Sequence, residues 1–348
     1  MATRLTFGVQ FGTFVRRPPE DFAQQVALAE QVGFSHVWMG EAYGSDALTP
    51  LAWAGSVTRR IGLGTAVMQI PARTPTAAAM AALTLDQLSG GRALIGFGVS
   101  GPQVVEGWYG QSFRRPLVRT REYFNVVRQV LRRRAPVTHE GAFYQLPLPG
   151  GTGLAKPLKS SLHPYREEQP LLLGAQGPNN VALAAEIADG WLPFFFSPSQ
   201  DAAYRQLLEE GFSRRSDDLS KPEDFQVVCP VPIALAGTAE EAADAVRPTL
   251  VLYIGGMGPR GKNFHFETFA RMGFEAEADT VQRAYLAGDK SGAAAAIPLE
   301  MVEEVALVGP PGKIRADLAR WESTLVTSLV VNPHRGDLRE IADVLMSH

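Results

Sequence analysis

The sequence feature that most constrains the fold is a regular alternation of short β-branched runs and amphipathic segments. The runs that are typical of strands are Leu5–Phe11, His36–Gly40, Ile61–Met68, Arg92–Val99, Pro170–Ala175, Gly190–Phe196, Phe225–Ala236 and Ser328–Val331. Most of them are followed by a turn and by apolar residues at helical spacing. Strands that alternate with helices in this way form parallel βαβ units. Eight such units predict an α/β fold of the (β/α)8 TIM-barrel type.

An open, doubly wound sheet is the main structural alternative to the barrel. That fold normally places a Gly-x-Gly-x-x-Gly turn after its first strand. The corresponding segment here, Leu5–Thr13, contains only Gly8 and Gly12. The missing turn and the strand count together favour the closed barrel.

Two segments interrupt the alternation. Val137–Glu168 is rich in Gly, Pro and polar residues and contains a hairpin-like piece, and Gly255–Ala296 reads as loops and helices. We expect both to be insertions, the first after strand and helix four and the second after helix seven. Barrels of this length commonly form one unit, so residues 1–348 are predicted to be a single domain.

Composition restricts the class of partner. The formal net charge is −3, which gives no electrostatic reason to expect nucleic acid or an anionic membrane. No run approaches the roughly 20 apolar residues of a membrane span, and the N-terminus lacks the apolar run of a signal peptide. The single cysteine, Cys229, lies in an apolar stretch typical of a core. We expect a cytoplasmic protein that acts on a small molecule.

Barrel enzymes carry their functional residues just past the C-terminal ends of the strands. Those positions here hold glycines, small residues, amides and one early acid, Glu41, and the usual metal, nucleophile and phosphate-loop motifs are missing. Such a set suits a large flat cofactor that brings its own chemistry. From the residues alone, Glu41 can be read either as a salt-bridged rim residue or as a functional acid. The loop Gly174–Asn180 can likewise be read either as a phosphate site or as a tight βα turn.

Several longer segments together are similar to one known family. They are Ile61–Pro75, Thr84–Arg92, Ile95–Gly101, Ala175–Pro178, Ala184–Trp191 and Ala306–Pro311. The chain resembles the luciferase-like (β/α)8 oxidoreductases, particularly the branch that uses the deazaflavin coenzyme F420 and its methylenetetrahydromethanopterin reductase-like subgroup. The resemblance covers nearly the whole chain, with the two insertions least constrained.

The resemblance implies roles for individual residues. Ala66 and Val67 match a strand-three bulge with a cis peptide bond that backs the deazaflavin ring, and the loops after strands four and five match segments that hold its ribityl and phosphate portions. Glu41 and Tyr43 are the predicted catalytic residues: Glu41 is to supply or hold a proton, and Tyr43 or Gln69 is to orient substrate. The predicted cofactor-binding residues are Glu41, Ala66, Val67, Gln69, Gly98, Ser100, Gln103, Gly174, Ala175, Gly177, Pro178 and Asn179.

One departure from the family pattern limits the reaction. The sugar-phosphate dehydrogenases of the family carry a histidine directly after the strand-two acid and an acid in the strand-four loop. This chain has Ala42 at the first position and Ser100-Gly-Pro at the second. Without that pair, proton removal from a sugar alcohol is unexplained, and the sugar-phosphate reaction is set aside.

The resulting hypothesis is a coenzyme F420-dependent oxidoreductase that transfers a hydride between the deazaflavin C5 and a small organic substrate. The alternatives are a luciferase-like monooxygenase that uses FMN and oxygen, and a non-catalytic flavin-binding protein on the same barrel. A metal-dependent hydrolase is the weakest alternative, since ligand spacings are missing. We further expect a homodimer that packs through barrel helices, with small-residue faces such as Thr76–Ala82.

Overall fold

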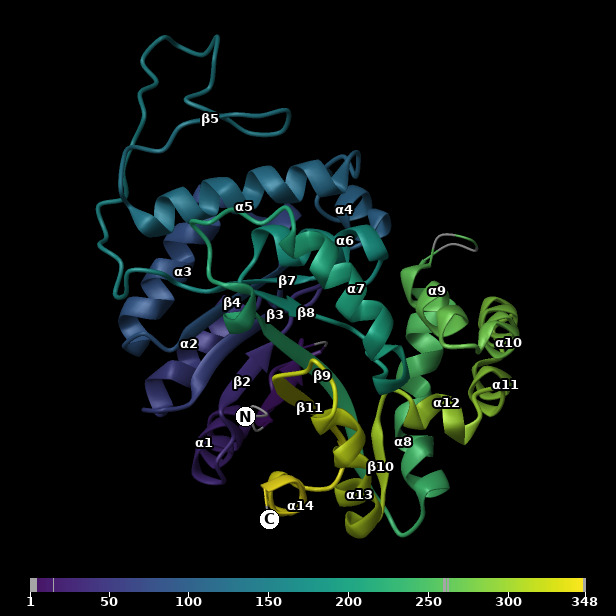
Figure 1. The fold of residues 1–348 in the computed structure, drawn as a ribbon. Helices are drawn as coiled ribbons and strands as arrows, with labels where there is room; N and C mark the ends of the chain where they lie inside the picture. Colours follow the sequence, from purple (N-terminus) through teal and green to yellow (C-terminus); the bar gives the residue numbers. More distant parts are fainter. Residues whose placement is uncertain (1–4, 15, 259–260, 262, 347–348) are drawn as a thin grey trace.

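A closed ring of eight parallel strands forms the centre of the computed structural model, which describes residues 5–14, 16–258, 261 and 263–346 (Figure 1). In ring order the strands are β1 (Thr6–Gly12), β2 (His36–Met39), β3 (Gly62–Gln69), β4 (Ala93–Gly98), β7 (Leu171–Gly174), β8 (Gly190–Leu192), β9 (Gln226–Leu235) and β11 (Ser328–Arg335). The β8–β9 and β1–β11 pairings close the ring. The predicted (β/α)8 barrel is confirmed, and all eight predicted strands are present.

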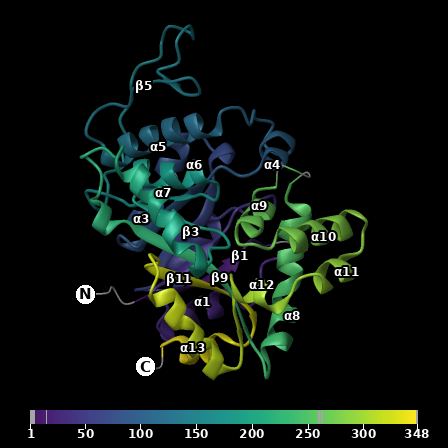
Figure 2. The same ribbon diagram turned by 45° about the vertical axis from the view of Figure 1, so that its right-hand side comes forward.

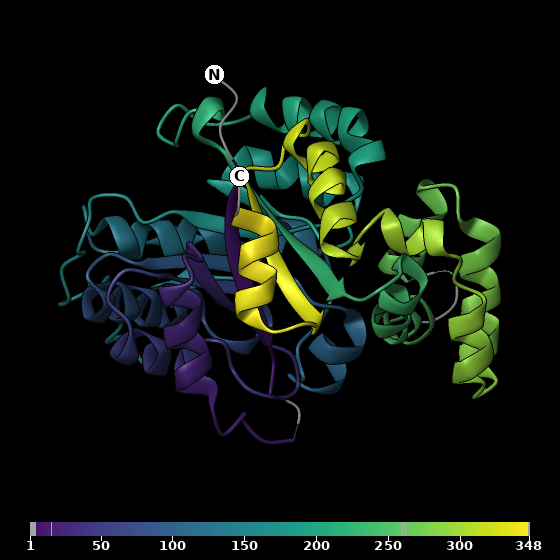
Figure 3. The same cartoon turned by 90° about the horizontal axis from the view of Figure 1, so that it is seen from below.

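Helices surround the ring, as the view from below shows (Figure 3). They are α1 (Phe22–Gln31), α2 (Leu48–Val57), α3 (Pro75–Ser89), α5 (Pro116–Arg132), α6 (Pro178–Ile187), α7 (Asp201–Phe212), α8 (Ala239–Val251), α13 (Pro311–Glu322) and α14 (Leu338–Met346). Short 3₁₀ turns lie at Ile70–Ala72, Pro198–Gln200 and Pro222–Asp224. Each helix buries the apolar stripe that its sequence spacing predicts. On α5, for example, Tyr123, Val127 and Leu131 are buried.

Two prolines, Pro18 and Pro19, precede α1, which begins at Phe22. The Phe22 N–H donates to the Pro19 carbonyl, so the preceding residues form a turn. Pro18 and Pro19 have no N–H of their own to contribute to a helical ladder.

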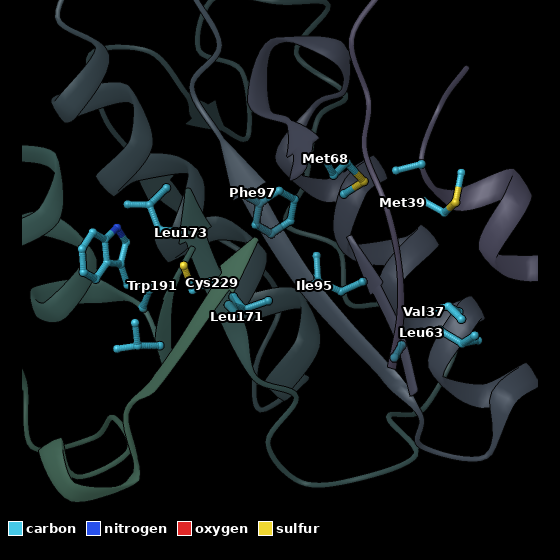
Figure 4. Close-up of a cluster of buried hydrophobic side chains, with 14 of the residues drawn as sticks. Val37, Met39, Leu63, Met68, Ile95, Phe97, Leu171, Leu173, Trp191 and Cys229 are labelled. Carbon is cyan, nitrogen blue, oxygen red and sulfur yellow. The ribbon is translucent and has the colours of Figure 1, made fainter. Parts of the chain in front are cut away.

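Apolar residues fill the barrel in two layers, because strand side chains alternate between its inside and its outside. The inner layer is Trp38, Leu94, Leu172, Leu192, Val228 and Val330. The outer layer, between strands and helices, includes Leu171, Leu173, Ile95, Phe97, Trp191 and Cys229 (Figure 4). Cys229 is fully buried, as its apolar surroundings predicted.

One strand was not predicted. β10 (Leu307–Gly309) pairs in parallel with β9 outside the ring, within the family-like segment Ala306–Pro311. Its three residues are too short for a sequence pattern to separate them from a loop.

The two insertions have different structures. The first contains the antiparallel pair β5 (His139–Glu140) and β6 (Gln145–Leu146), and it projects away from the barrel (Figures 1 and 2). The second is helical: η4 (Leu252–Gly256), α9 (Phe264–Arg271), α10 (Glu275–Leu286), α11 (Lys290–Ala295) and α12 (Leu299–Glu303). A short α4 (Pro102–Gly107) follows β4. Within the described ranges, no helix is both long and apolar enough to span a membrane.

Candidate active site at the mouth of the barrel

The floor of the candidate site is the end of β3. The β3–β4 register shifts between Thr65 and Met68, which marks a bulge, and the peptide bond between Ala66 and Val67 is cis. Both residues pack on the inner core and remain partly exposed above it. The bulge therefore closes the top of the packed barrel interior and presents Ala66 and Val67 to the mouth.

Two predicted cofactor residues, Gly98 and Gly174, are glycines because Val67 lies against them. A Cβ at Gly98 would be 2.4 Å from Val67 Cγ2, and one at Gly174 would be 2.8 Å from Val67 Cγ1. Real Cβ atoms do not approach so closely, so any larger residue would displace Val67. The ends of β3, β4 and β7 thus meet in one tight surface.

Glu41 is held in an ion pair at the end of β2. Its side chain is 4% exposed, and Arg73 Nη1 lies 2.7 Å from Oε1 and 2.9 Å from Oε2. The Gln69 backbone N–H donates to Oε2 at 2.8 Å. The Glu41 backbone N–H in turn donates to the Val67 carbonyl at 3.2 Å. Both carboxylate oxygens are therefore occupied, and Glu41 fastens the β2 loop to the β3 bulge.

Gln69 has one polar atom left over. Its Nε2 donates to the Glu41 carbonyl at 2.8 Å, which fixes the amide orientation. Its Oε1 is buried and has no hydrogen-bond partner among the described residues. Since buried polar atoms are nearly always paired, this oxygen is available as an acceptor for an N–H group of a bound molecule.

Two tyrosines support this side of the mouth. The Tyr109 hydroxyl donates to the Ala42 carbonyl at 3.3 Å, and the Tyr123 hydroxyl donates to the Arg73 carbonyl at 3.3 Å. Burial, with the negative charge of Glu41 as a further cause, raises the pKa of Tyr109. Burial also raises the pKa of Tyr123. Arg73 was not predicted. The signal available for it was one basic residue, four positions after Gln69, within a matching family segment.

The loops after β4 and β7 expose backbone. Ser100 has a φ of 60°, the left-handed region that non-glycine residues avoid. Gly177 precedes α6, and a Cβ there would meet nothing within 4 Å. The backbone N–H groups of Gly177 and Asn179 have no acceptor within the described part of the chain. Free N–H groups at the start of a ten-residue helix suit an anion such as a phosphate.

The remaining predicted residues lie at the rim or behind the floor. Tyr43 is 58% exposed. Gln103, Pro178 and Asn179 are also exposed. Ala175 is buried, and its carbonyl accepts from Trp191 Nε1 at 2.8 Å, so it supports the loop from behind.

An aromatic group that sequence reasoning missed lies on the opposite side of the mouth. It consists of Phe194 and Phe195 after β8, Tyr253 in η4 and His265 in α9. Burial raises the pKa of Tyr253, and the Tyr43 phenol raises it further. Tyr43 follows β2, and Phe194 and Phe195 follow β8, which lies four positions away in a ring of eight, so Tyr43 and the aromatic group lie on opposite sides of the mouth.

Comparison with known proteins identifies the family. Residues 5–328 match the model of the luciferase-like monooxygenase family. The chain belongs to this family. A Mycobacterium tuberculosis protein assigned as a coenzyme F420-dependent oxidoreductase is 49% identical over 346 residues, 99% of each chain. The 5,10-methylenetetrahydromethanopterin reductase of Archaeoglobus fulgidus is 25% identical over 94% of this chain and 92% of its own.

Solved structures of the family share the fold. The tetrahydromethanopterin reductase from Methanopyrus kandleri superposes with a TM-score of 0.79 at 23% identity, covering 99% of this chain and 97% of that one. The oxygenating constituent of 3,6-diketocamphane monooxygenase from Pseudomonas putida, in complex with FMN, gives 0.65 at 18% identity, covering 98% and 93%. The family resemblance inferred from the motifs is confirmed, and the chain is an enzyme of the oxidoreductase class.

Proposed function

We propose that this protein is a coenzyme F420-dependent oxidoreductase that transfers a hydride between the deazaflavin C5 and a small organic substrate. The observation that carries the proposal is the floor of the mouth. There the Ala66–Val67 bulge is fixed between Gly98 and Gly174, and the buried acceptor Gln69 Oε1 follows on the same strand. The name of the relative that is 49% identical supports the choice of coenzyme.

The residues present fit such a cofactor. Val67 would offer an apolar surface for one face of a flat ring, and Gln69 Oε1 would accept a hydrogen bond from a ring N–H. The free N–H groups of Gly177 and Asn179 would hold the phosphate, and Ser100 and Gln103 would contact the part of the cofactor that links ring and phosphate. When bound in its reduced form, the coenzyme supplies a hydride, that is, two electrons and one hydrogen.

Glu41 takes a positioning role in this proposal. Its carboxylate is occupied by Arg73 and by the Gln69 N–H, so it sets where the β3 bulge and Gln69 lie. The earlier prediction that Glu41 supplies or holds a proton is tested by Glu41→Gln. Unchanged cofactor affinity and turnover in that variant would remove Glu41 from the mechanism. Tyr43, exposed at the rim, is retained as the residue that orients substrate.

Cofactor titration tests the proposal directly. We expect coenzyme F420 to quench the intrinsic tryptophan fluorescence with micromolar affinity, and FMN to bind much more weakly. Gly177→Ala is the sharpest variant, because its φ of −73° tolerates alanine while the new Cβ enters the open space at the α6 N-terminus. We expect about tenfold weaker binding with unchanged stability. Gly312→Ala, which also meets nothing within 4 Å, is the matched control.

The FMN-dependent monooxygenase is kept as the second candidate, because a solved structure with the same fold holds FMN. Preference for FMN in the titration, together with an oxygen requirement for turnover, would move the assignment there. Tight binding of either cofactor without turnover of any acceptor would favour the non-catalytic flavin-binding protein. Binding of neither would overturn the proposed function and leave the barrel unaffected.

We also propose that the protein forms a homodimer through α2 and α3. Trp53 is 64% exposed on α2, and Met80 and Leu88 are 59% and 76% exposed on α3. Large exposed side chains on neighbouring helices are unusual in a monomer, and covering them removes apolar surface from water. We expect Trp53→Glu to give a monomer by light scattering. Leu286→Glu, at a 63% exposed position on α10, should leave the mass unchanged.

A further inference from the structure

The second insertion brings a histidine to the mouth of the barrel. His265 lies in the first turn of α9, and Asn263 caps that helix by accepting from the His265 N–H at 2.9 Å. The His265 ring contacts three other rings: Tyr253 at 4.8 Å, Phe194 at 5.5 Å and Phe195 at 5.8 Å between centroids. Its Nδ1 lies 3.1 Å from Gln176 Nε2, in the loop that follows β7. His265 therefore joins the insertion to the C-terminal ends of β7 and β8.

The hydrogen bonds around Gln176 determine where the imidazole proton is. Gln176 Nε2 also lies 2.9 Å from the Phe194 carbonyl oxygen. A carbonyl only accepts, so the amide must place its NH₂ group, and not its oxygen, at this position. The second hydrogen of that NH₂ group then points to His265 Nδ1, which accepts it. The proton of the neutral ring must therefore be on Nε2.

His265 is neutral, and its second nitrogen is free. Burial lowers the pKa of His265 to about 4, with no charged neighbour contributing. The residue as a whole is partly exposed. No described residue forms a hydrogen bond with Nε2. At neutral pH the ring thus offers one uncharged N–H donor, which Gln176 fixes in place.

The surroundings of this donor are aromatic. Phe195 follows the end of β8 and has a φ of 56°, in the left-handed region that non-glycine residues avoid. The two consecutive residues Phe194 and Phe195 both contact Tyr253 and His265. Phe194, Tyr253 and His265 each remain partly exposed. Such rings bind flat, apolar molecules by stacking or edge contacts.

We propose that His265 Nε2–H donates a hydrogen bond to the substrate oxygen, and that the substrate is an uncharged, flat, conjugated carbonyl compound. The choice of class follows from neutral donors, the His265 Nε2–H and the Tyr253 hydroxyl, set among aromatic rings. The inference rests on the proposed function for the reaction, but the binding preference is independent of it.

The reduction balances with groups already named. The carbonyl carbon gains the hydride as a new C–H bond, and the π electron pair of the C=O bond moves to oxygen. The Nε2–H hydrogen bond stabilises that developing negative charge, as a preorganised neutral donor does. The oxygen would then take a proton from water, and the hydroxide left over would be neutralised by the proton that the reduced coenzyme loses along with its hydride, so that the alcohol and the oxidised coenzyme would be the products. His265 keeps its own proton throughout.

Calorimetric binding of 4-phenylbut-3-en-2-one to the protein loaded with oxidised coenzyme F420, and to the protein without it, tests the proposal. The hydrocarbon control is 1-phenylbut-1-ene, which lacks the oxygen. His265→Asn keeps an acceptor for Gln176 but places no donor at the Nε2 position, whereas His265→Gln restores a donor there. The exposed His163→Asn serves as the control variant.

We expect His265→Asn to weaken ketone binding roughly ten- to a hundredfold, with His265→Gln within several-fold of the wild type. The hydrocarbon should lose much less affinity than the ketone in His265→Asn, because it loses only the ring contact, and ketone affinity should be flat from pH 5.5 to 8. Equal ketone affinity in wild type and His265→Asn would overturn the proposal, as would equal losses for ketone and hydrocarbon. Affinity that rises as the pH falls through 6.5 would indicate a cationic ring and also overturn it. Failure of coenzyme F420 to bind would remove the proposed function, while the ketone preference of the unloaded protein would still decide the role of His265.

Discussion

The two sides of the barrel mouth are built from different chemistry. On the β2–β3 side, charged and polar groups are paired with one another. The Glu41 carboxylate binds Arg73 and the Gln69 N–H, and the Glu41 N–H donates to the Val67 carbonyl. On the β8 side, Phe194, Tyr253 and His265 present aromatic surface with uncharged donors. The first side is fixed by paired charges, and the second by ring packing.

The difference suggests that the two sides of the mouth have different functions. In the proposed function the polar side holds the cofactor, which needs a fixed floor, and a network of paired buried groups gives one defined geometry. A substrate that differs between relatives needs a surface that substitution can alter. The aromatic side is built partly by the second insertion, the least constrained part of the family resemblance. Breaking each side should therefore have distinct consequences.

Removing Arg73 should have the largest effect. Arg73→Ala leaves the Glu41 carboxylate, 4% exposed, without its cation. An uncompensated buried charge of this kind costs about 3 kcal/mol in the free energy of unfolding. Chemical denaturation measures it, with Arg205→Ala as control, because the Arg205–Asp201 pair is an i,i+4 pair with Arg205 49% exposed. That control should cost less than about 0.5 kcal/mol. Equal effects of the two variants would show that the polar side is not held by its ion pair.

The barrel itself was predictable from sequence, because eight strand-and-helix units obey local patterns. β10 was not predictable, because three residues are too few to show a hydrophobic period. The floor residues Ala66, Val67, Gly98 and Gly174 were found through the family resemblance, although no pattern shows that Val67 fills the space beside both glycines. Arg73 and His265 were missed for another reason. Their roles depend on partners 32 and 89 residues away in the sequence, which only the tertiary structure brings together.

Filling the floor should have the next largest effect. Gly98→Ala would place a methyl group 2.4 Å from Val67 Cγ2, and overpacking of this kind costs about 2 kcal/mol. Because Val67 must shift, we also expect weaker cofactor binding in the same fluorescence titration. Gly312→Ala, inside α13 with open space around it, should be neutral or slightly stabilising. A Gly98→Ala variant with unchanged stability and cofactor affinity would mean that the floor is adaptable, and the contrast with the aromatic side would weaken.

Acidification should have the smallest effect and should act on the aromatic side. The folded-state pKa of His265, about 4, lies below the ordinary value of 6.5, so the unfolded chain takes up a proton first as the pH falls. The contribution of His265 to stability is therefore complete above pH 6.5 and is lost as the pH approaches 4. For a partly exposed ring we expect a loss of about 1 kcal/mol between pH 7 and 5. His265→Asn should lack that part of the pH dependence in denaturation curves measured at both values.

Tyr253, the titratable group that packs on the ring, stays protonated in this range because its pKa is raised, so it does not contribute. Identical pH dependence in the wild type and in His265→Asn would show that His265 is not held neutral by burial. The tautomer inferred from Gln176 would then no longer define its donor, and the aromatic side would lose its fixed N–H donor.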